Sequence, residues 1–127
     1  MTLWLSERII LELHGIQIAR HGGVPGLRDR GLLESALARP RNLAIYEQAD
    51  TVQLGASYAI AIARNHPFTD GNKRAAWISL VLFLSLNGME LDASEPDAIV
   101  AMIDMAAGRM TDTEFTLWVR DHTTAQA

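Results

Sequence analysis

Residues 51–88 decide the fold, and they read TVQLGASYAIAIARNHPFTDGNKRAAWISLVLFLSLNG. The first part, beginning at Thr51, predicts a helix rich in glycine, alanine and serine, and such small residues allow neighbouring helices to pack closely. The last part, from Lys73 to Leu86, predicts a second helix that is apolar nearly all round. Because a helix that is apolar on every side belongs in a core, we expect it to be the central helix of the domain.

Polar residues that cap helices predict four more helices around these two. The predicted caps are Ser6, Asp29, Ser94 and Thr111, the last in a capping box with Glu114. In the first of these helices, Ile9, Leu13 and Ile16 recur at helical spacing. The pattern contains no strand signal that competes with the helices. It therefore predicts one all-α domain over residues 1–127, a compact six-helix bundle around the central apolar helix.

Details of three segments follow from the same rules. Pro40 is expected to end the second helix, and Leu43–Tyr46 after it suits either a strand-like flap or one helical turn. In the fifth helix, the core-facing residues are expected to be Ile99, Met102, Ile103 and Ala106. The polar end of the chain, Thr123–Ala127, is expected to be frayed.

The composition excludes several classes of protein. A chain of 127 residues without cysteine fits one domain and has neither thiol catalysis nor cysteine metal sites. Its net charge of −4 argues against general binding to nucleic acid. Its longest apolar stretch, Ala75–Leu86, would span roughly 18 Å, which is too short for a bilayer core of about 30 Å. With no basic residues ahead of an apolar N-terminal stretch, a soluble cytoplasmic protein is expected.

The segment between the two apolar helices carries the chemistry. Residues 64–74, RNHPFTDGNKR, bring together a histidine, an acid, an amide and three cations. A helix that begins near Lys73 leaves its first backbone N–H groups pointing back at the loop, and Gly71 lets the backbone approach a ligand closely. These N–H groups, the helix dipole and the charges of Arg64, Lys73 and Arg74 favour a bound phosphate.

Two further side chains suit phosphate chemistry. Asp70 could hold Mg²⁺ that bridges phosphate oxygens, and His66 could accept the proton of an attacking hydroxyl near neutral pH. Each residue also has a structural alternative, with His66 as a helix cap, Asp70 or Asn72 as a turn or cap residue, Arg74 as a solvated side chain and Phe68 as a core anchor. The gathering of all these groups in one loop favours the functional interpretation.

Residues 66–74, His-Pro-Phe-Thr-Asp-Gly-Asn-Lys-Arg, resemble the Fic signature, His-Pro-Phe-x-(Asp/Glu)-Gly-Asn-Gly-Arg, with one departure at Lys73. A lysine at this place resembles the Doc (death-on-curing) branch of the Fic/Doc family, whose members are toxins of toxin–antitoxin pairs. The resemblance extends to residues 22–37 and 75–91, and so covers essentially the whole chain.

The resemblance implies a six-helix Fic fold and roles for individual residues. His66 would be the catalytic base, and Asp70 the Mg²⁺ ligand or orienting acid. The residues that would bind the phosphates of ATP are Arg64, Gly71, Asn72, Lys73 and Arg74.

Lys73 is the only lysine among 11 basic residues, and it points to a particular reaction. A lysine fills the room that the signature glycine leaves for a phosphate chain, so the nucleotide would bind reversed and present its γ-phosphate. The resemblance then implies a type II toxin, a protein kinase that phosphorylates a threonine of elongation factor Tu and blocks translation. Longer Fic enzymes, which transfer AMP, carry a further arginine at the position of Trp77, and its absence here argues against that reaction. AMP transfer to a protein hydroxyl (AMPylation) is therefore kept as the alternative. A non-catalytic helical binding module is the second alternative.

Two partners follow from the resemblance. A cognate, Phd-like antitoxin would act in trans, because the chain lacks the Ser/Thr-x-x-x-Glu pattern of an inhibitory helix. Apolar walls for it are expected from Trp4, Leu5, Phe115, Trp118 and Val119, although these residues could equally close the core. The protein target would pair with a flap at Leu43–Tyr46, and neither a membrane nor a nucleic acid is expected as a direct partner.

Overall fold

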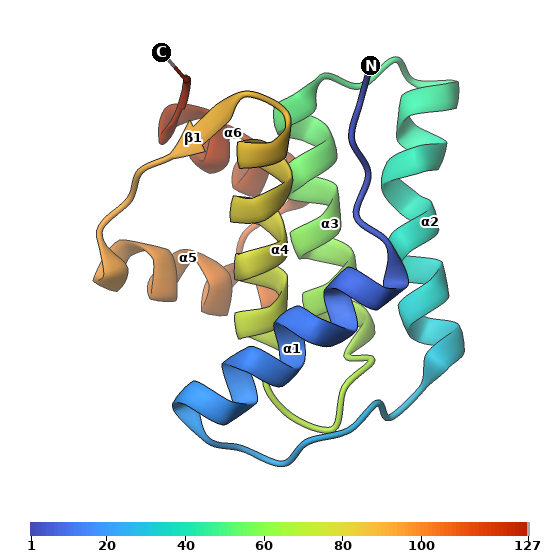
Figure 1. Ribbon diagram of the computed structural model, residues 1–127. Helices are drawn as coiled ribbons and strands as arrows, with labels where there is room; N and C mark the ends of the chain where they lie inside the picture. Colours follow the sequence, from blue (N-terminus) through green and yellow to red (C-terminus); the bar gives the residue numbers. More distant parts are fainter. Residues whose placement is uncertain (127) are drawn as a thin grey trace.

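The computed structural model describes residues 1–126 and shows a helical bundle (Figure 1). Within these residues there are six helices and two short strands. In chain order they are α1 (Glu7–His21), α2 (Arg30–Tyr46), α3 (Thr51–Asn65), α4 (Asn72–Leu86), β1 (Met89–Leu91), α5 (Glu95–Ala106), α6 (Asp112–Asp121) and β2 (Thr123–Ala125). The predicted all-α, six-helix fold is therefore confirmed. None of these helices is both long and apolar enough to cross a membrane.

The helices begin where side chains can satisfy their first N–H groups. The side chains of Ser6, Asp29, Ser94 and Thr111 each accept a hydrogen bond from a backbone N–H in the first turn of their helix, as predicted. Helix α3 has a further cap, Asp50, which forms a capping box with Gln53. The start of α4 differs, because its N-cap is Gly71 and no side chain bonds to its first N–H groups.

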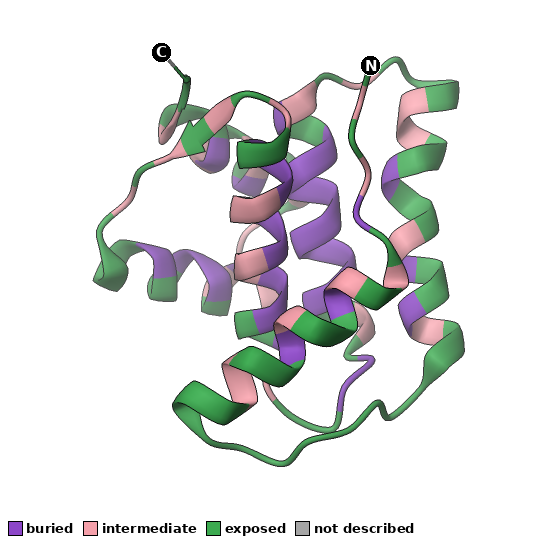
Figure 2. Cartoon of the chain, viewed as in Figure 1, coloured by how far each residue is buried: buried purple, intermediate pink, exposed green. Residues whose placement is uncertain are grey.

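The centre of the bundle consists of α3 and α4 lying side by side, and Figure 2 shows α3 buried along most of its length. Every residue of α3 from Leu54 to Ala63 is buried. Close packing of the two helices depends on Gly55, since a Cβ atom there would lie 3.1 Å from methyl carbons of both Leu80 and Leu84. The small residues of α3 thus allow the close approach that the sequence predicted.

The prediction that Pro40 ends the second helix is wrong, because α2 continues through Pro40 to Tyr46. A proline inside a helix removes one hydrogen bond and clashes with the preceding turn. Here its ring is fully buried, and Leu43 and Ala44 beyond it pack against the core. Packing over the last two turns therefore outweighs the local cost, and Leu43–Tyr46 is helical rather than a flap.

Two further expectations need correction. The end of the chain is not frayed from Thr123, because Thr123–Ala125 forms β2, which pairs antiparallel with β1 and returns the chain to the end of α4; Ala127 lies outside the described residues. In α5, Met102 is buried as expected, but Ile99 and Ile103 are exposed and Ala98, Ala101 and Met105 are buried instead. Helical spacing gives the period of the pattern, and the packing partner decides which face is covered.

The contact between α3 and α4 can be tested with one substitution at two glycines. We expect Gly55→Val to lower the free energy of unfolding by about 1–3 kcal/mol, because the added carbons overpack against Leu80 and Leu84. Gly15 in α1 is the matched control, since a Cβ atom there meets no atom within 4 Å. Denaturant unfolding should show Gly15→Val to be no less stable than the wild type, and equal losses at both sites would contradict the close contact.

Candidate functional site

The predicted motif lies in the turn that joins the end of α3 to the start of α4, at the lower end of the bundle in Figure 1. His66 is the C-cap residue of α3 and has a left-handed backbone (φ 55°, ψ 53°), which is uncommon for a residue other than glycine. Its side chain is exposed, whereas Pro67 and Phe68 after it are buried. The imidazole therefore faces solvent from a loop that is anchored in the core.

A loop from another part of the chain, residues 22–29, lies along this turn. The N–H groups of Arg28 and Asp29 donate to the carbonyl oxygen of Pro67, at 2.7 and 3.0 Å, and the N–H of Thr69 donates to that of Gly26 at 3.1 Å. Leu27 and Phe68 form an antiparallel bridge. Residues 22–29 thus run along the motif and pair with its backbone. The sequence patterns did not predict this pairing.

Arg28 is a site residue that sequence reasoning missed. Its guanidinium donates to the carbonyl oxygen of His66 through Nε at 2.9 Å and through a terminal nitrogen at 2.6 Å, and it also reaches that of Asn65. A cation at the C-terminal end of a helix is favoured by the exposed carbonyls and by the dipole. Arg28 therefore holds the backbone of His66 in its unusual conformation.

Asp70 is oriented by backbone N–H groups from both loops. Its carboxylate accepts from the N–H of Val24 at 3.1 Å and from that of Gly71 at 2.9 Å. These two hydrogen bonds, helped by the charge of Arg74, hold the pKa of Asp70 below its ordinary value. The group is exposed and ionised at neutral pH.

Asn72 closes the turn between the two central helices. Its buried side chain accepts from the N–H of Phe68 at 2.9 Å and donates to the carbonyl oxygen of the same residue at 3.0 Å. The side-chain amide is used in this pair, so what Asn72 can still offer to a ligand is its backbone N–H. That N–H belongs to the first turn of α4, where it has no partner within the helix.

The start of α4 has features that favour a bound anion. Gly71 has a left-handed backbone (φ 74°), and a side chain there would approach Ile18 and His14. The uncapped N–H groups and the helix dipole point out of the first turn toward the loop. The side chains of Lys73 and Arg74 are exposed in this same turn. The residues Gly71, Asn72, Lys73 and Arg74, which the sequence predicted to bind phosphate, thus lie at the start of α4 directly after Asp70.

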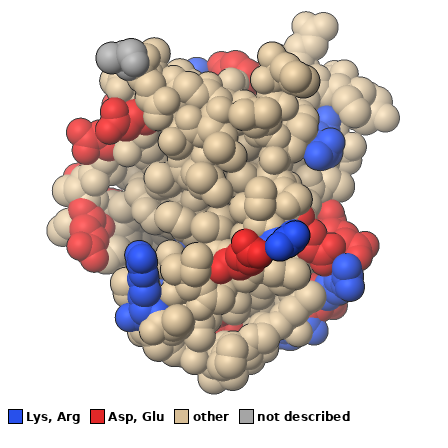
Figure 3. All heavy atoms as spheres, in the orientation of Figure 1, with Lys and Arg blue, Asp and Glu red and all other residues tan. Residues whose placement is uncertain are grey.

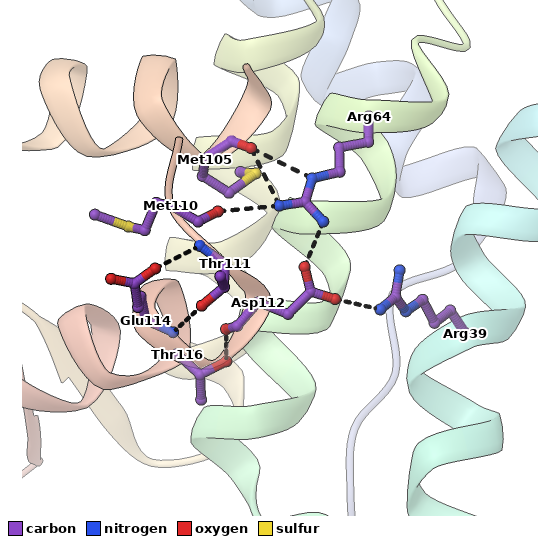
Figure 4. A network of polar contacts seen from close by, with 8 residues as sticks. All are labelled: Arg39, Arg64, Met105, Met110, Thr111, Asp112, Glu114 and Thr116. Atoms are coloured by element: carbon purple, nitrogen blue, oxygen red, sulfur yellow. Dashed lines mark hydrogen bonds and ion pairs between the residues drawn. The ribbon is translucent and has the colours of Figure 1, made fainter. Parts of the chain in front are cut away.

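Arg64 does not share this arrangement, and the expectation that it binds phosphate is corrected. Figure 4 shows its guanidinium turned toward the start of α6, where it pairs with Asp112 and donates to the carbonyl oxygens of Met105 and Met110. Arg39 of α2 pairs with the other oxygen of Asp112 at 2.7 Å. Burial by itself raises the pKa of Asp112, but the two arginines outweigh it and the pKa lies below its ordinary value. Arg64 thus ties α3 to α5 and α6.

The residues present fit a divalent cation only in part. Among residues 1–126, no cluster of three or more His, Asp or Glu side chains could hold a metal ion by itself. Asp70 offers one ionised, exposed carboxylate next to the anion site. Mg²⁺ is commonly held by one or two carboxylates together with substrate phosphates and water. The donor set therefore suits an ion that arrives with a nucleotide.

The chain is similar to known proteins over most of its length. The family model described as Fic/DOC family matches residues 4–84, and the chain belongs to that family. It is 35% identical over 108 residues to Protein kinase doc of Escherichia phage P1, covering 84% of this chain and 85% of that protein. It is 38% identical over 96 residues to Toxin Doc of Mycolicibacterium smegmatis, covering 73% of this chain and 71% of that protein.

A solved structure shares the fold. The crystal structure of BepC, a VirB-translocated effector protein from Bartonella tribocorum with bound AMPPNP, has a TM-score of 0.52 and is 19% identical. The match covers 75% of this chain and 50% of BepC, so the chain spans half the length of that structure. At this identity the likeness shows the shared helical fold alone.

The closure of the motif by Asn72 gives a stability prediction. Asn72→Ala should lower the free energy of unfolding by about 2–4 kcal/mol, because a buried N–H and a buried carbonyl of Phe68 lose their partners. Asn87 is the control, since its side chain makes the same reciprocal pair with the backbone of Leu3 in an exposed place; it also donates to the carbonyl oxygen of Phe83. Water replaces those bonds, and we expect Asn87→Ala to cost about 1 kcal/mol in denaturant unfolding. A smaller loss at Asn72 than at Asn87 would contradict this role.

Proposed function

We propose that this chain is a Doc-type toxin of a type II toxin–antitoxin pair. It transfers the γ-phosphate of ATP to a threonine hydroxyl of elongation factor Tu, in the cytoplasm, and so blocks translation. The names of the two relatives, Protein kinase doc and Toxin Doc, support this class. One structural observation carries the proposal. An exposed histidine, His66, ends α3, and a short turn later α4 begins without a side-chain cap, with Lys73 and Arg74 in its first turn.

Each residue of the motif has a separate role in the proposed phosphoryl transfer. His66 accepts the proton of the attacking hydroxyl, whose oxygen forms a bond to the γ-phosphorus while the bond to the β-phosphate oxygen breaks and ADP leaves. The N–H groups at the start of α4, with Lys73 and Arg74, bind the phosphates and stabilise charge on their oxygens. Asp70 would hold Mg²⁺, which when bound neutralises phosphate charge.

Lys73 supports phosphate transfer over AMP transfer. It lies in the first turn of α4, two residues after Gly71, and its charged side chain is exposed there. A phosphate chain that ran along this turn with its α-phosphorus near His66 would meet that side chain. AMPylation remains the competing reaction, since the same base and the same anion site would serve it.

The protein target is proposed to meet residues 22–27 rather than the end of α2. Leu43–Tyr46 lies at the opposite end of α2 from the motif, as Figure 1 shows. Residues 22–27 are exposed throughout, with Val24 57% and Leu27 37% exposed, and they pair with the motif by backbone hydrogen bonds. An extended target segment could continue this pairing and bring its hydroxyl to His66.

Isotope-labelled ATP tests the reaction. With purified elongation factor Tu, we expect label from γ-labelled ATP, and none from α-labelled ATP, to appear on a threonine. His66→Ala should slow this transfer by about 10²–10⁴-fold, because the general base is lost, while its melting temperature stays near that of the wild type. Transfer of the α-label would establish AMPylation, and no transfer of either label would favour a non-catalytic binding module.

An antitoxin is the second proposed partner. We propose a binding surface for it that differs from the one expected from the sequence. Leu5, Phe115 and Val119 are buried, so these expected walls close the core instead. The exposed apolar residues of α5 are Ile99, Val100 and Ile103. On the face drawn in Figure 3, charged side chains gather toward the edges and along α1, and the area over α4 above them is uncharged. Because Ile99, Val100 and Ile103 are exposed on one helix, we propose that the antitoxin contacts α5 through them.

Co-purification with the product of the neighbouring gene tests this contact. The double variant Ile99→Ser, Ile103→Ser should weaken the complex by about tenfold or more, because two side chains that bury apolar area on binding are removed. Leu117→Ser on α6 is the control, since Leu117 is similarly exposed at 53% and lies outside α5. Equal effects of the two changes, measured by calorimetry, would place the antitoxin elsewhere.

A further inference from the structure

A histidine outside the motif, His14 of α1, contacts the motif turn at Phe68 and at the backbone of Asp70. Its side chain is buried, with an exposed fraction of 4%. Nε2 lies 2.8 Å from the carbonyl oxygen of Asp70, and the ring stacks on that of Phe68 with centroids 3.8 Å apart and planes 5° from parallel. Because a carbonyl oxygen only accepts, Nε2 carries the proton and donates.

We propose that His14 is a positioning residue that fixes the direction of the Asp70–Gly71 peptide and thereby orients the Asp70 carboxylate. The catalytic consequence rests on the proposed function, whereas the effect on the loop does not. Asp70 is the group that would face the phosphates and Mg²⁺, and His14 acts only through it.

The geometry of the peptide bond explains how one hydrogen bond can orient a side chain. In a planar trans peptide, the C=O and the N–H point in opposite directions. With the carbonyl of Asp70 held by His14, the N–H of Gly71 points outward, where it donates to Oδ1 of Asp70 at 2.9 Å. Oδ2 accepts from the N–H of Val24 at 3.1 Å. A rotation of this peptide would remove the first of these bonds and displace the second.

The peptide needs such a restraint because Gly71 follows it. Glycine adopts positive and negative φ angles with similar ease, so its own backbone does not select φ 74°. The backbone of Phe68 is held by Asn72, and its ring is held by the stacked ring of His14. The stacking on Phe68 fixes the position of Nε2 of His14, and the hydrogen bond from Nε2 fixes the direction of the carbonyl of Asp70.

Two substitutions of similar length separate the hydrogen bond from the ring. His14→Gln keeps an N–H donor near the position of Nε2, and His14→Met has none; both lose the aromatic ring. Residue-resolved amide exchange, measured by NMR without nucleotide, reports on the N–H groups of Gly71 and Val24. We expect exchange at both to be several-fold faster in His14→Met than in His14→Gln, at similar melting temperatures.

The same pair is then assayed for phosphate transfer from γ-labelled ATP. We expect kcat to fall by about 10-fold to 100-fold in His14→Met, because a displaced carboxylate misplaces the phosphates, and to be largely recovered in His14→Gln. A purely structural role would give both variants the same kcat and the same exchange rates, and that result overturns the proposal.

His122 supplies the matched control. It also bonds a backbone carbonyl, that of Trp118 at 2.7 Å, and its ring packs on the Trp118 ring with centroids 4.4 Å apart, but it lies at the end of α6 beside β2. His122→Met and His122→Gln should leave kcat and the exchange of Gly71 and Val24 unchanged. If the wild-type chain transfers no phosphate, the proposed function fails, and amide exchange alone decides whether His14 positions the loop.

Discussion

The pair of hydrogen bonds between the side chain of Asn72 and the backbone of Phe68 is the constraint on which the rest of the structure depends. It closes the turn between α3 and α4, the two helices that form the centre of the bundle, and it does so where water has no access. Since both partners are buried, an open turn would leave polar groups unsatisfied in the core. The short turn therefore has one conformation. The groups on its outer side have fixed positions for the same reason.

The outer side of the turn concentrates positive charge on a molecule whose net charge is negative. The protein has a net charge of −4, yet Lys73 and Arg74 stand at an uncapped helix start. A local field of this kind attracts an anion even when the whole molecule repels it. The turn is also held from three directions, by Arg28 at His66, by Val24 at Asp70 and by His14 below. Anchoring from separate elements suits a site whose chemistry depends on position more than on reactivity.

Much of the fold and most of the candidate site could be predicted because they depend on neighbours in the chain. Caps such as Ser6 and Thr111 act within one turn, and the motif residues from Gly71 to Arg74 lie together because they are consecutive. The failures involve distant partners. Pro40 lies inside α2 because its ring is buried, which no local rule reports. Ile10, His14 and Ile18 lie four residues apart, and that spacing could have placed His14 on the buried stripe of α1.

The sequence by itself determined the six helices, the turn between the two apolar ones, and the family, since these follow from periodicity, capping and a run of nine consecutive residues. Only the tertiary structure decided what each charged side chain does. Arg64 is two residues from His66, yet it binds Asp112 of α6, while Arg28, far away in sequence, holds the backbone of His66. A long side chain at the end of a helix can reach several elements, and the partner it meets depends on how those elements pack.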